Sequence, residues 1–290
     1  MSEERVTYGG QAVIEGVMMR GPKRMAIAVR RPDGEIAIHQ EEVKSVLQRY
    51  PFLRLPILRG MIALVETMST GISALMYSAS QAMPDEEQLS KKEMTITTAL
   101  GFALAIGIFV VAPTLLTNYV KSLSTSSMIT HVVEGALRLG LFIGYLSVIS
   151  LMKDIQRVYQ YHGAEHKVIN TYEAGDPLTV ESARKHSREH KRCGTSFLLY
   201  VVVISILFFS IFSISDVWLR ILVRIGMLPI VAGISYEIIR LAGKYDNLLV
   251  NIISRPGMWL QGLTTREPDD SQLEVAIASF ETARGHGLPG

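Results

Sequence analysis

Four of the seven histidines of this chain and its only cysteine fall within 32 consecutive positions. They are His162, His166, His186, His190 and Cys193. On a helix, His162 and His166 lie one turn apart on the same face, and Glu165 projects close beside them. Neutral imidazoles, a thiolate and a carboxylate that converge in space are suitable ligands for a transition metal. This stretch therefore predicts a metal site.

The order of residues around the first histidine pair is informative. His162, Glu165 and His166 match the inverted zinc-protease pattern, in which both histidines bind Zn²⁺ and the glutamate activates the bound water. Such sites take a further ligand from downstream in the chain. The downstream candidates are His186, His190, Cys193, Glu237 and Asp246.

From these candidates we predict a mixed histidine and cysteine site with divalent zinc as its metal. The expected ligands are His162, His166, His190 and Cys193, with His186 as a further candidate. Glu165 is expected to act as the general base or to orient a histidine ligand. Two ordinary explanations compete with this hypothesis. The histidines could be solvated or hydrogen-bonded to one another, and Glu237 could form an ion pair with Arg240 on the same helix.

Long apolar stretches flank the histidine-rich region. Four of them are long enough to cross a hydrocarbon core of about 30 Å as helices. They are residues 95–117, 132–152, 196–215 and 217–240. Buried helices of a soluble protein are the alternative, but the short connections within each pair disfavour it. The sequence predicts a mainly α, polytopic membrane protein with four transmembrane helices in two hairpins.

The basic residues lie mostly on one side of these expected spans. Residues 1–93 contain 12 Lys or Arg and residues 153–195 contain 8, whereas 118–131 and 213–216 contain only Lys121. Because cytoplasmic loops carry the excess of Lys and Arg, we expect a multi-pass protein of the cytoplasmic membrane with both termini in the cytoplasm. A net charge of +2 gives no support for nucleic acid as a partner.

The first 55 residues predict a cytoplasmic β-rich segment. The apolar residues 25–29 and the mostly apolar residues 35–38 flank Pro32-Asp33-Gly34, a combination typical of a hairpin. The glycine-rich residues 9–22 predict either a strand that enters a tight turn or a loop that lines a pocket with Gln11 and Glu15. Glu237 is a further candidate for the lining of that pocket. Residues 56–93 then predict an amphipathic helix and a linker, with the helix in the cytoplasmic membrane interface or packed beneath the bundle.

The remaining segments are expected to follow the spans. They are a first hairpin at 94–152, a histidine-rich loop at 153–195, a second hairpin at 196–241 and a C-terminal tail at 242–290. We expect the second span to continue through Tyr161 into the first histidine pair. Thr179 can cap a short helix that carries His186 and His190. In the tail, residues 255–259 predict a turn, and residues 268–280 predict an amphipathic helix.

Four segments resemble hallmark motifs of the YqhQ-type bacterial membrane proteins. They are residues 9–22, 162–167, 192–197 and 264–268. The resemblance extends over nearly the whole chain, and one departure is Lys191, where that family is expected to have proline. The family is classed as a domain of unknown function and labelled a predicted metal-dependent enzyme. The resemblance therefore implies metal-dependent chemistry without naming a reaction or a substrate.

These observations favour a metal-dependent membrane enzyme, with hydrolysis as the expected reaction. A site at the cytoplasmic membrane surface predicts a membrane protein or a lipid headgroup as substrate, and the bilayer and other membrane proteins as partners. The alternative is a non-catalytic scaffold or membrane-protein biogenesis factor, whose structural zinc would leave no position for water. The third hypothesis is a transporter, which requires a polar path near the middle of the bilayer.

Overall fold

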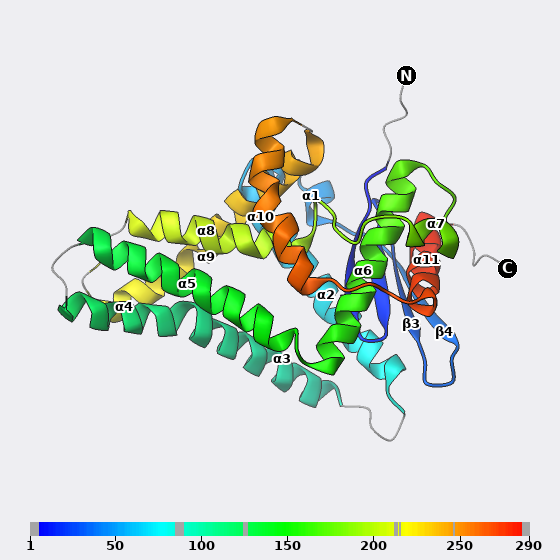
Figure 1. Cartoon of the computed structure of the whole chain (residues 1–290), viewed down its shortest axis with the longest axis horizontal. Helices are drawn as coiled ribbons and strands as arrows, with labels where there is room; N and C mark the ends of the chain where they lie inside the picture. Colours follow the sequence, from blue (N-terminus) through cyan, green and yellow to red (C-terminus); the bar gives the residue numbers. More distant parts are fainter. Residues whose placement is uncertain are drawn as a thin grey trace.

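The computed structural model describes residues 6–84, 90–123, 127–211, 214, 216–245 and 247–285. The described chain is mainly helical and carries one antiparallel sheet near its N-terminal end. The sheet lies with α6 (Lys153–Ala174) and α11 (Asp270–Arg284) at one end of the molecule, and a bundle of long apolar helices extends away from them (Figure 1).

Four consecutive strands form the sheet in the order β1-β2-β3-β4. They are Gly9–Val13, Gly16–Arg20, Arg24–Arg30 and Ile36–Glu42. The predicted β3–β4 hairpin is confirmed, and Gly34 in its turn has a φ of 91°, which glycine adopts without strain. The glycine-rich segment forms a second hairpin with a tight turn, in which Val13 pairs with Gly16. The β-rich start of the chain is therefore confirmed.

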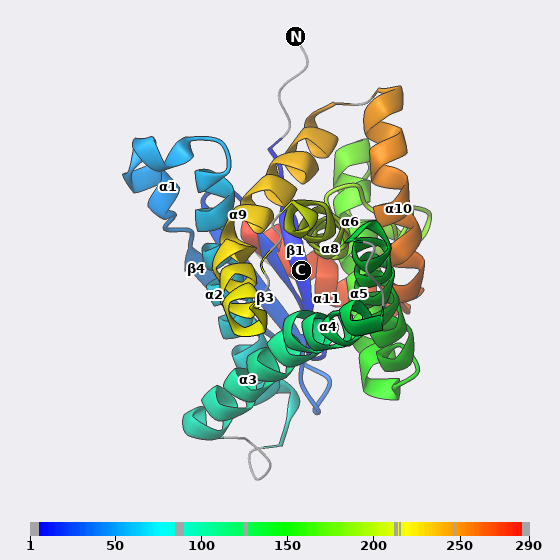
Figure 2. The same cartoon turned by 90° about the vertical axis from the view of Figure 1, so that its left-hand side faces the viewer.

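Helices cover both faces of the sheet (Figure 2). On one face, Met19 and Ala26 pack with α6 and α11. On the other, Met18 and Ile27 pack with Ala74 of α2 (Leu58–Ala82). Successive residues of the central strands thus enter two separate cores, which explains their continuous apolar runs.

Helix α11 differs in role from the amphipathic tail helix that the sequence predicts. Its start is as expected, because Asp269 caps it and accepts a hydrogen bond from the Gln272 amide. Most of its side chains are buried between the sheet and α6. The helix is therefore a core element, because the sheet and α6 enclose it on more than one side.

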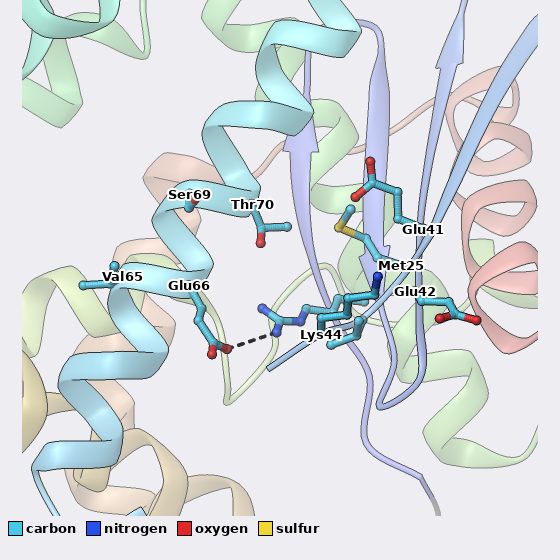
Figure 3. Close-up of a pocket in the computed structure, with 10 residues that line it drawn as sticks. Met25, Glu41, Glu42, Lys44, Val65, Glu66, Ser69 and Thr70 are labelled. Atoms are coloured by element: carbon cyan, nitrogen blue, oxygen red, sulfur yellow. Dashed lines mark hydrogen bonds and ion pairs between the residues drawn. The ribbon is translucent and has the colours of Figure 1, made fainter. Parts of the chain in front are cut away.

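Glu66 of α2 links this helix to β2 and to the start of α1 (Val46–Arg49). Its carboxylate accepts hydrogen bonds from the Val46 amide at 2.7 Å and the Ser45 hydroxyl at 3.0 Å, and it pairs with Arg20 at 3.4 Å. Figure 3 shows Glu66 facing the ends of the strands across a pocket of about 440 Å³. These contacts hold the start of α1 beside α2, and η1 (Pro51–Arg54) follows α1 in the chain.

Three helical segments of the described chain are long and apolar enough to span a membrane. They are Lys92–Tyr119, Val132–Ile149 and Val217–Lys244. The first runs through α3 (Lys91–Ile106), η3 (Gly107–Val111) and α4 (Ala112–Leu123); the second lies in α5 (Ser127–Ile149), and the third is α9 (Val217–Lys244). These helices indicate a membrane protein. The other predicted span forms α8 (Gly194–Ser210), a shorter apolar helix of 17 residues, so the prediction of four spans is confirmed only in part.

Two local predictions are wrong: the extent of the second span and the turn at residues 255–259. The second span does not run on into the histidine pair, because α5 ends at Ile149 and α6 begins at Lys153. The Ser150 carbonyl between them accepts hydrogen bonds from the side chains of Gln156 and Arg266, so this break has its own polar partners.

The second wrong prediction is the turn at 255–259, which lies inside α10 (Leu248–Thr264). Gly257 of this helix packs so tightly on α8 that an added Cβ would lie 2.5 Å from Ser196 Oγ. Packing against α8 thus overrides the local turn signal of proline and glycine.

Candidate metal centre

Helix α6 directs His162 and His166 toward Cys193, and two backbone carbonyls outside this helix fix the orientation of both rings. The Nδ1 atom of His162 lies 2.8 Å from the Thr264 carbonyl oxygen, and that of His166 lies 2.6 Å from the Arg188 carbonyl oxygen. Because a carbonyl oxygen only accepts, each Nδ1 must carry a proton, and in the neutral ring each Nε2 keeps its lone pair. Metal-binding histidines are typically held in this way through the nitrogen that does not bind the metal.

Cys193 completes a group of three candidate ligands. Its Sγ atom lies 3.2 Å from Nε2 of His162, and the ligand atoms of Cys193, His162 and His166 all lie within 4.8 Å of one another. In tetrahedral zinc sites, the usual bond lengths place neighbouring N and S ligands roughly 3.3–3.7 Å apart. The three side chains therefore fit a zinc ion with small adjustments.

A cavity of about 600 Å³ adjoins the three ligands. Glu165 of α6 lines it, and so does Gln11 of β1, as the pocket hypothesis for the glycine-rich segment expects. Glu165 is only 5% exposed, and the Gly10 backbone makes a hydrogen bond to its carboxylate. Burial raises the pKa of Glu165 to about 7, although His162 and the Gly10 backbone act in the opposite direction.

His190 reaches the same cavity, but both its ring nitrogens have other partners. Its Nε2 lies 3.3 Å from the Glu173 carboxylate, and its Nδ1 accepts a hydrogen bond from the Arg192 amide at 3.4 Å. Its ring centre is 5.7 Å from that of His166. His190 therefore lies next to the group of three candidate ligands but does not belong to it.

His186 lies outside the cavity, where its Nε2 contacts the Asp176 carboxylate at 2.9 Å. Helix α7 (Val180–Arg184) is capped by Thr179 as expected, but it ends before both histidines, so the prediction that it carries them is wrong. Side chains of α6 instead bind the backbone of the following loop. Lys167 donates to the carbonyls of Arg184 and His186, and Asn170 donates to those of Ser187 and Glu189.

Glu15 and Glu237 do not line this cavity, in contrast to the pocket hypothesis. Glu15 occupies the β1–β2 turn, where it pairs with Arg157 and accepts a hydrogen bond from the Tyr161 hydroxyl. Glu237 pairs with Arg59 of α2, and the expected partner Arg240 is more distant at 3.9 Å. Asp246 lies outside the described residues.

Glu173 is a residue of the site region that the sequence reasoning missed. Burial raises its pKa, but hydrogen bonds from His190 and Arg192 outweigh that effect and lower the pKa to about 2. It follows His166 by two helical turns, so its position on the histidine face of α6 was a usable signal. The carbonyls of Thr264 and Arg188 gave no comparable signal, because backbone groups carry no residue-type information.

Gly163 lies between the two histidine ligands, where close packing requires a glycine. An added Cβ would lie 2.1 Å from the Arg266 carbonyl oxygen, so only glycine lets the chain after α10 approach α6 this closely. The Arg266 amide donates to the Tyr159 carbonyl at 2.9 Å in the same place. Segments around residues 10, 162–167, 192–195 and 264–266 therefore meet at one site.

Comparison with known proteins identifies the family of the chain. The sequence model of the family described as "Protein of unknown function (DUF1385)" matches residues 55–286. The "Uncharacterized protein YqhQ" of Bacillus subtilis (strain 168) is 35% identical over 297 residues, which cover 97% of this chain and 93% of the relative. No solved structure matches the chain. The chain belongs to the DUF1385 family, and its full-length similarity to YqhQ identifies it as a YqhQ-type member.

Proposed function

We propose that this protein is a zinc-dependent hydrolase of the cytoplasmic membrane. The observation that carries the proposal is the group formed by His162, His166 and Cys193, with both imidazoles held at Nδ1 by carbonyl oxygens. Three protein ligands leave a fourth position open for water, which is typical of catalytic zinc sites. A zinc ion bound there would supply Lewis acidity and activate water.

Glu165 is the residue that we assign as the general base. Its carboxylate lines the cavity beside the ligands, and the Gly10 backbone holds it there. It would accept a proton at a carboxylate oxygen and return it to the leaving group, as glutamate does in other zinc hydrolases. A cavity of about 600 Å³ lies in the size range of small-molecule sites, so a lipid headgroup or a short peptide segment fits it.

The proposed location rests on α8 as the fourth span. At 17 residues it lies at the lower limit for crossing a bilayer. Cys193 caps its first turn, so insertion of α8 would hold the metal centre at the membrane surface. The excess of Lys and Arg in residues 1–93 and 153–195 favours the cytoplasmic surface. A membrane protein or a lipid headgroup is therefore the substrate that we propose.

A scaffold with structural zinc is the weaker alternative. It needs a fourth protein ligand, and among the described residues His190 lies beside the group but uses both nitrogens elsewhere. Transport is weaker still, because the described cavity beside Glu134 and Arg138 in the spans measures about 10 Å³, room for about one water molecule.

A cysteine hydrolase is a second candidate, and one contact favours it. Cys193 Sγ lies 3.2 Å from His162 Nε2 and accepts a hydrogen bond from the Thr195 amide at the start of α8. A cysteine paired with histidine at a helix N-terminus is the setting of an activated thiol nucleophile. This candidate requires no metal, so metal content separates it from the zinc hydrolase.

Elemental analysis of the purified protein tests the proposal. We expect stoichiometric zinc in the wild type, and its loss in His162→Ala, His166→Ala and Cys193→Ser. Glu165→Gln should retain zinc, and so should the matched control His186→Ala, which removes a histidine outside the cavity. A wild type without metal whose cellular function is abolished by thiol alkylation would support the cysteine hydrolase instead. Equal zinc in His162→Ala and the wild type would overturn the proposed centre.

A further inference from the structure

Helix α10 exposes several large apolar side chains while it buries polar ones. Leu249, Ile252 and Trp259 are 66%, 59% and 70% exposed. On the opposite side, Gln261 is fully buried and donates to the His190 carbonyl and the Ser196 hydroxyl at 3.0 Å each. A helix that faces water exposes its polar residues and buries its apolar ones. This exposed face of α10 is therefore suited to an apolar environment.

The exposed side chains form one continuous stripe along α10. Residues 249, 252, 256 and 259 recur at the spacing of one helical face, and all of them are exposed. Each fully buried side chain of this kind gains about 1.5–3 kcal/mol over exposure to water. At the same time, α10 is not among the described helices that are long and apolar enough to span a membrane. A helix with a strong apolar face and too few apolar residues to cross is typical of the membrane interface.

The position of α10 places this stripe next to the expected lipid surface. Figure 1 shows α10 running across the start of α8, at a steep angle to the long axis of the bundle. The Tyr200 hydroxyl of α8 donates to the Ile253 carbonyl at 3.1 Å, and Gly257 packs on Ser196. The helix therefore lies at the level of the first two turns of α8, where that apolar helix begins.

The two tryptophans of the chain support the same placement. Trp259 lies on α10, and Trp218 begins α9 at the opposite end of the bundle with 73% exposure. Tryptophan is enriched at both membrane interfaces, where its ring contacts acyl chains and its N–H group contacts water or headgroups. Arg255, exposed on α10, adds a positive charge suited to lipid phosphates.

A second exposed apolar segment lies at the same level. In η1, Phe52 is 67% exposed, and Leu55 after it is 62% exposed, with the basic residues Arg49 and Arg54 nearby. Figure 1 shows α1 and α10 at a similar position along the long axis, and Figure 2 shows them on opposite sides of the bundle. Two apolar and basic surfaces at one level are the arrangement expected where a protein passes through one face of a bilayer.

We propose that α10 is an in-plane membrane helix that rests in the leaflet nearest the sheet. Leu249, Ile252 and Trp259 contact acyl chains, and Arg255 contacts lipid phosphates. Because Thr264 ends this helix and holds His162 by its carbonyl, the depth of α10 in the leaflet sets the height of the cavity above the acyl chains. The lipid contact itself does not depend on the metal or on hydrolysis.

Tryptophan fluorescence tests this placement. The Trp218→Phe variant leaves Trp259 as its single tryptophan and is reconstituted into vesicles of phosphatidylcholine and phosphatidylglycerol. We expect emission shifted to short wavelength and quenched more by lipids brominated near the carboxyl end of the acyl chain than by lipids brominated near its methyl end. Aqueous iodide should quench it weakly.

A matched control gives the emission and quenching expected of a tryptophan exposed to water. In this control, Trp218→Phe and Trp259→Phe are combined with Glu35→Trp, so that the single tryptophan lies in the exposed β3–β4 hairpin. It should emit at long wavelength and respond to iodide but not to brominated lipid. If Trp259 behaves like this control, the in-plane placement is wrong. The measurement uses protein stripped of metal as well as untreated protein, so its outcome is separate from that of the zinc analysis.

Discussion

The Nδ1 atom of His162 lies 2.8 Å from the carbonyl oxygen of Thr264, a residue 102 positions further along the chain. Thr264 is the last residue of α10, where helical carbonyls have no partner within the helix. That free carbonyl orients the imidazole, so the end of one helix sets the geometry of a ligand on another. The candidate centre therefore depends on the contact between the C-terminal end of α10 and α6 as much as on the ligands themselves.

Gly163→Ala should separate these two segments. The added methyl group would lie 2.1 Å from the Arg266 carbonyl oxygen, which is backbone and cannot rotate away. We expect a loss of about 1–3 kcal/mol in the free energy of unfolding, the usual range for overpacking, together with weaker zinc binding. Thermal denaturation and zinc titration of the purified protein measure both effects.

Gly262→Ala is the matched control for that variant. Gly262 is a helical glycine of α10 with nothing within 4 Å of an added Cβ. Alanine there should leave zinc binding unchanged and stabilise the protein by up to about 1 kcal/mol, because it favours the helix. Equal effects of the two variants would show that close approach at Gly163 is not what holds His162.

Gly10→Ala should disturb Glu165 while leaving the metal ligands in place. Its added Cβ would lie 2.8 Å from the Glu165 carboxylate oxygen and 2.8 Å from the Met18 carbonyl. We expect retained zinc, a lower midpoint of thermal unfolding and a loss of cellular function like that of Glu165→Gln. Gly9→Ala is the control, since nothing lies within 4 Å of a Cβ there. Full function in Gly10→Ala would speak against a role for Glu165 as general base.

Glu134→Ala should be among the most destabilising single changes in the spans. The Glu134 carboxylate pairs with Arg138 at 2.9 Å and with Arg224 at 2.6 Å, and all three side chains are nearly buried. Removing the carboxylate leaves two buried guanidinium groups without it, which costs about 3–5 kcal/mol. Thermal unfolding in detergent measures the loss.

The comparison for that prediction is Arg184→Ala, which breaks an exposed ion pair. Arg184 and Asp270 are 56% and 58% exposed, and exposed pairs contribute about 0–1 kcal/mol. The Glu134 variant should therefore unfold at a clearly lower temperature than the Arg184 variant. Similar midpoints would mean that the buried group is not held by its ion pairs.

The sequence correctly predicted the elements that local residue patterns determine. Alternating and continuous apolar runs around Pro32-Asp33-Gly34 predicted the hairpin, and the length of the apolar stretches predicted membrane helices. The histidine spacing on α6 placed His162 and His166 on one face, and the structure brings Cys193 beside them. Each of these features depends on periodicity or length, which can be read from the residues alone.

Tertiary contacts decided the features that the sequence did not reveal. The sequence made His190 an expected ligand and His186 a further candidate, yet contacts from Lys167 and Asn170 to the loop backbone accompany their pairing with Glu173 and Asp176. Proline and glycine in α10 predicted a turn, but packing on α8 keeps the helix continuous. Every residue has a backbone carbonyl, so the sequence could not indicate which carbonyls orient the ligands. The structure identifies them.

X-ray absorption of zinc in the purified wild-type protein tests the central claim most directly. The account predicts two imidazole nitrogens, one sulfur at about 2.3 Å and one lighter non-protein ligand such as water. The sulfur contribution should disappear from any residual zinc in Cys193→Ser. A spectrum without sulfur, or one with a third imidazole in place of water, would contradict an open catalytic site built from His162, His166 and Cys193.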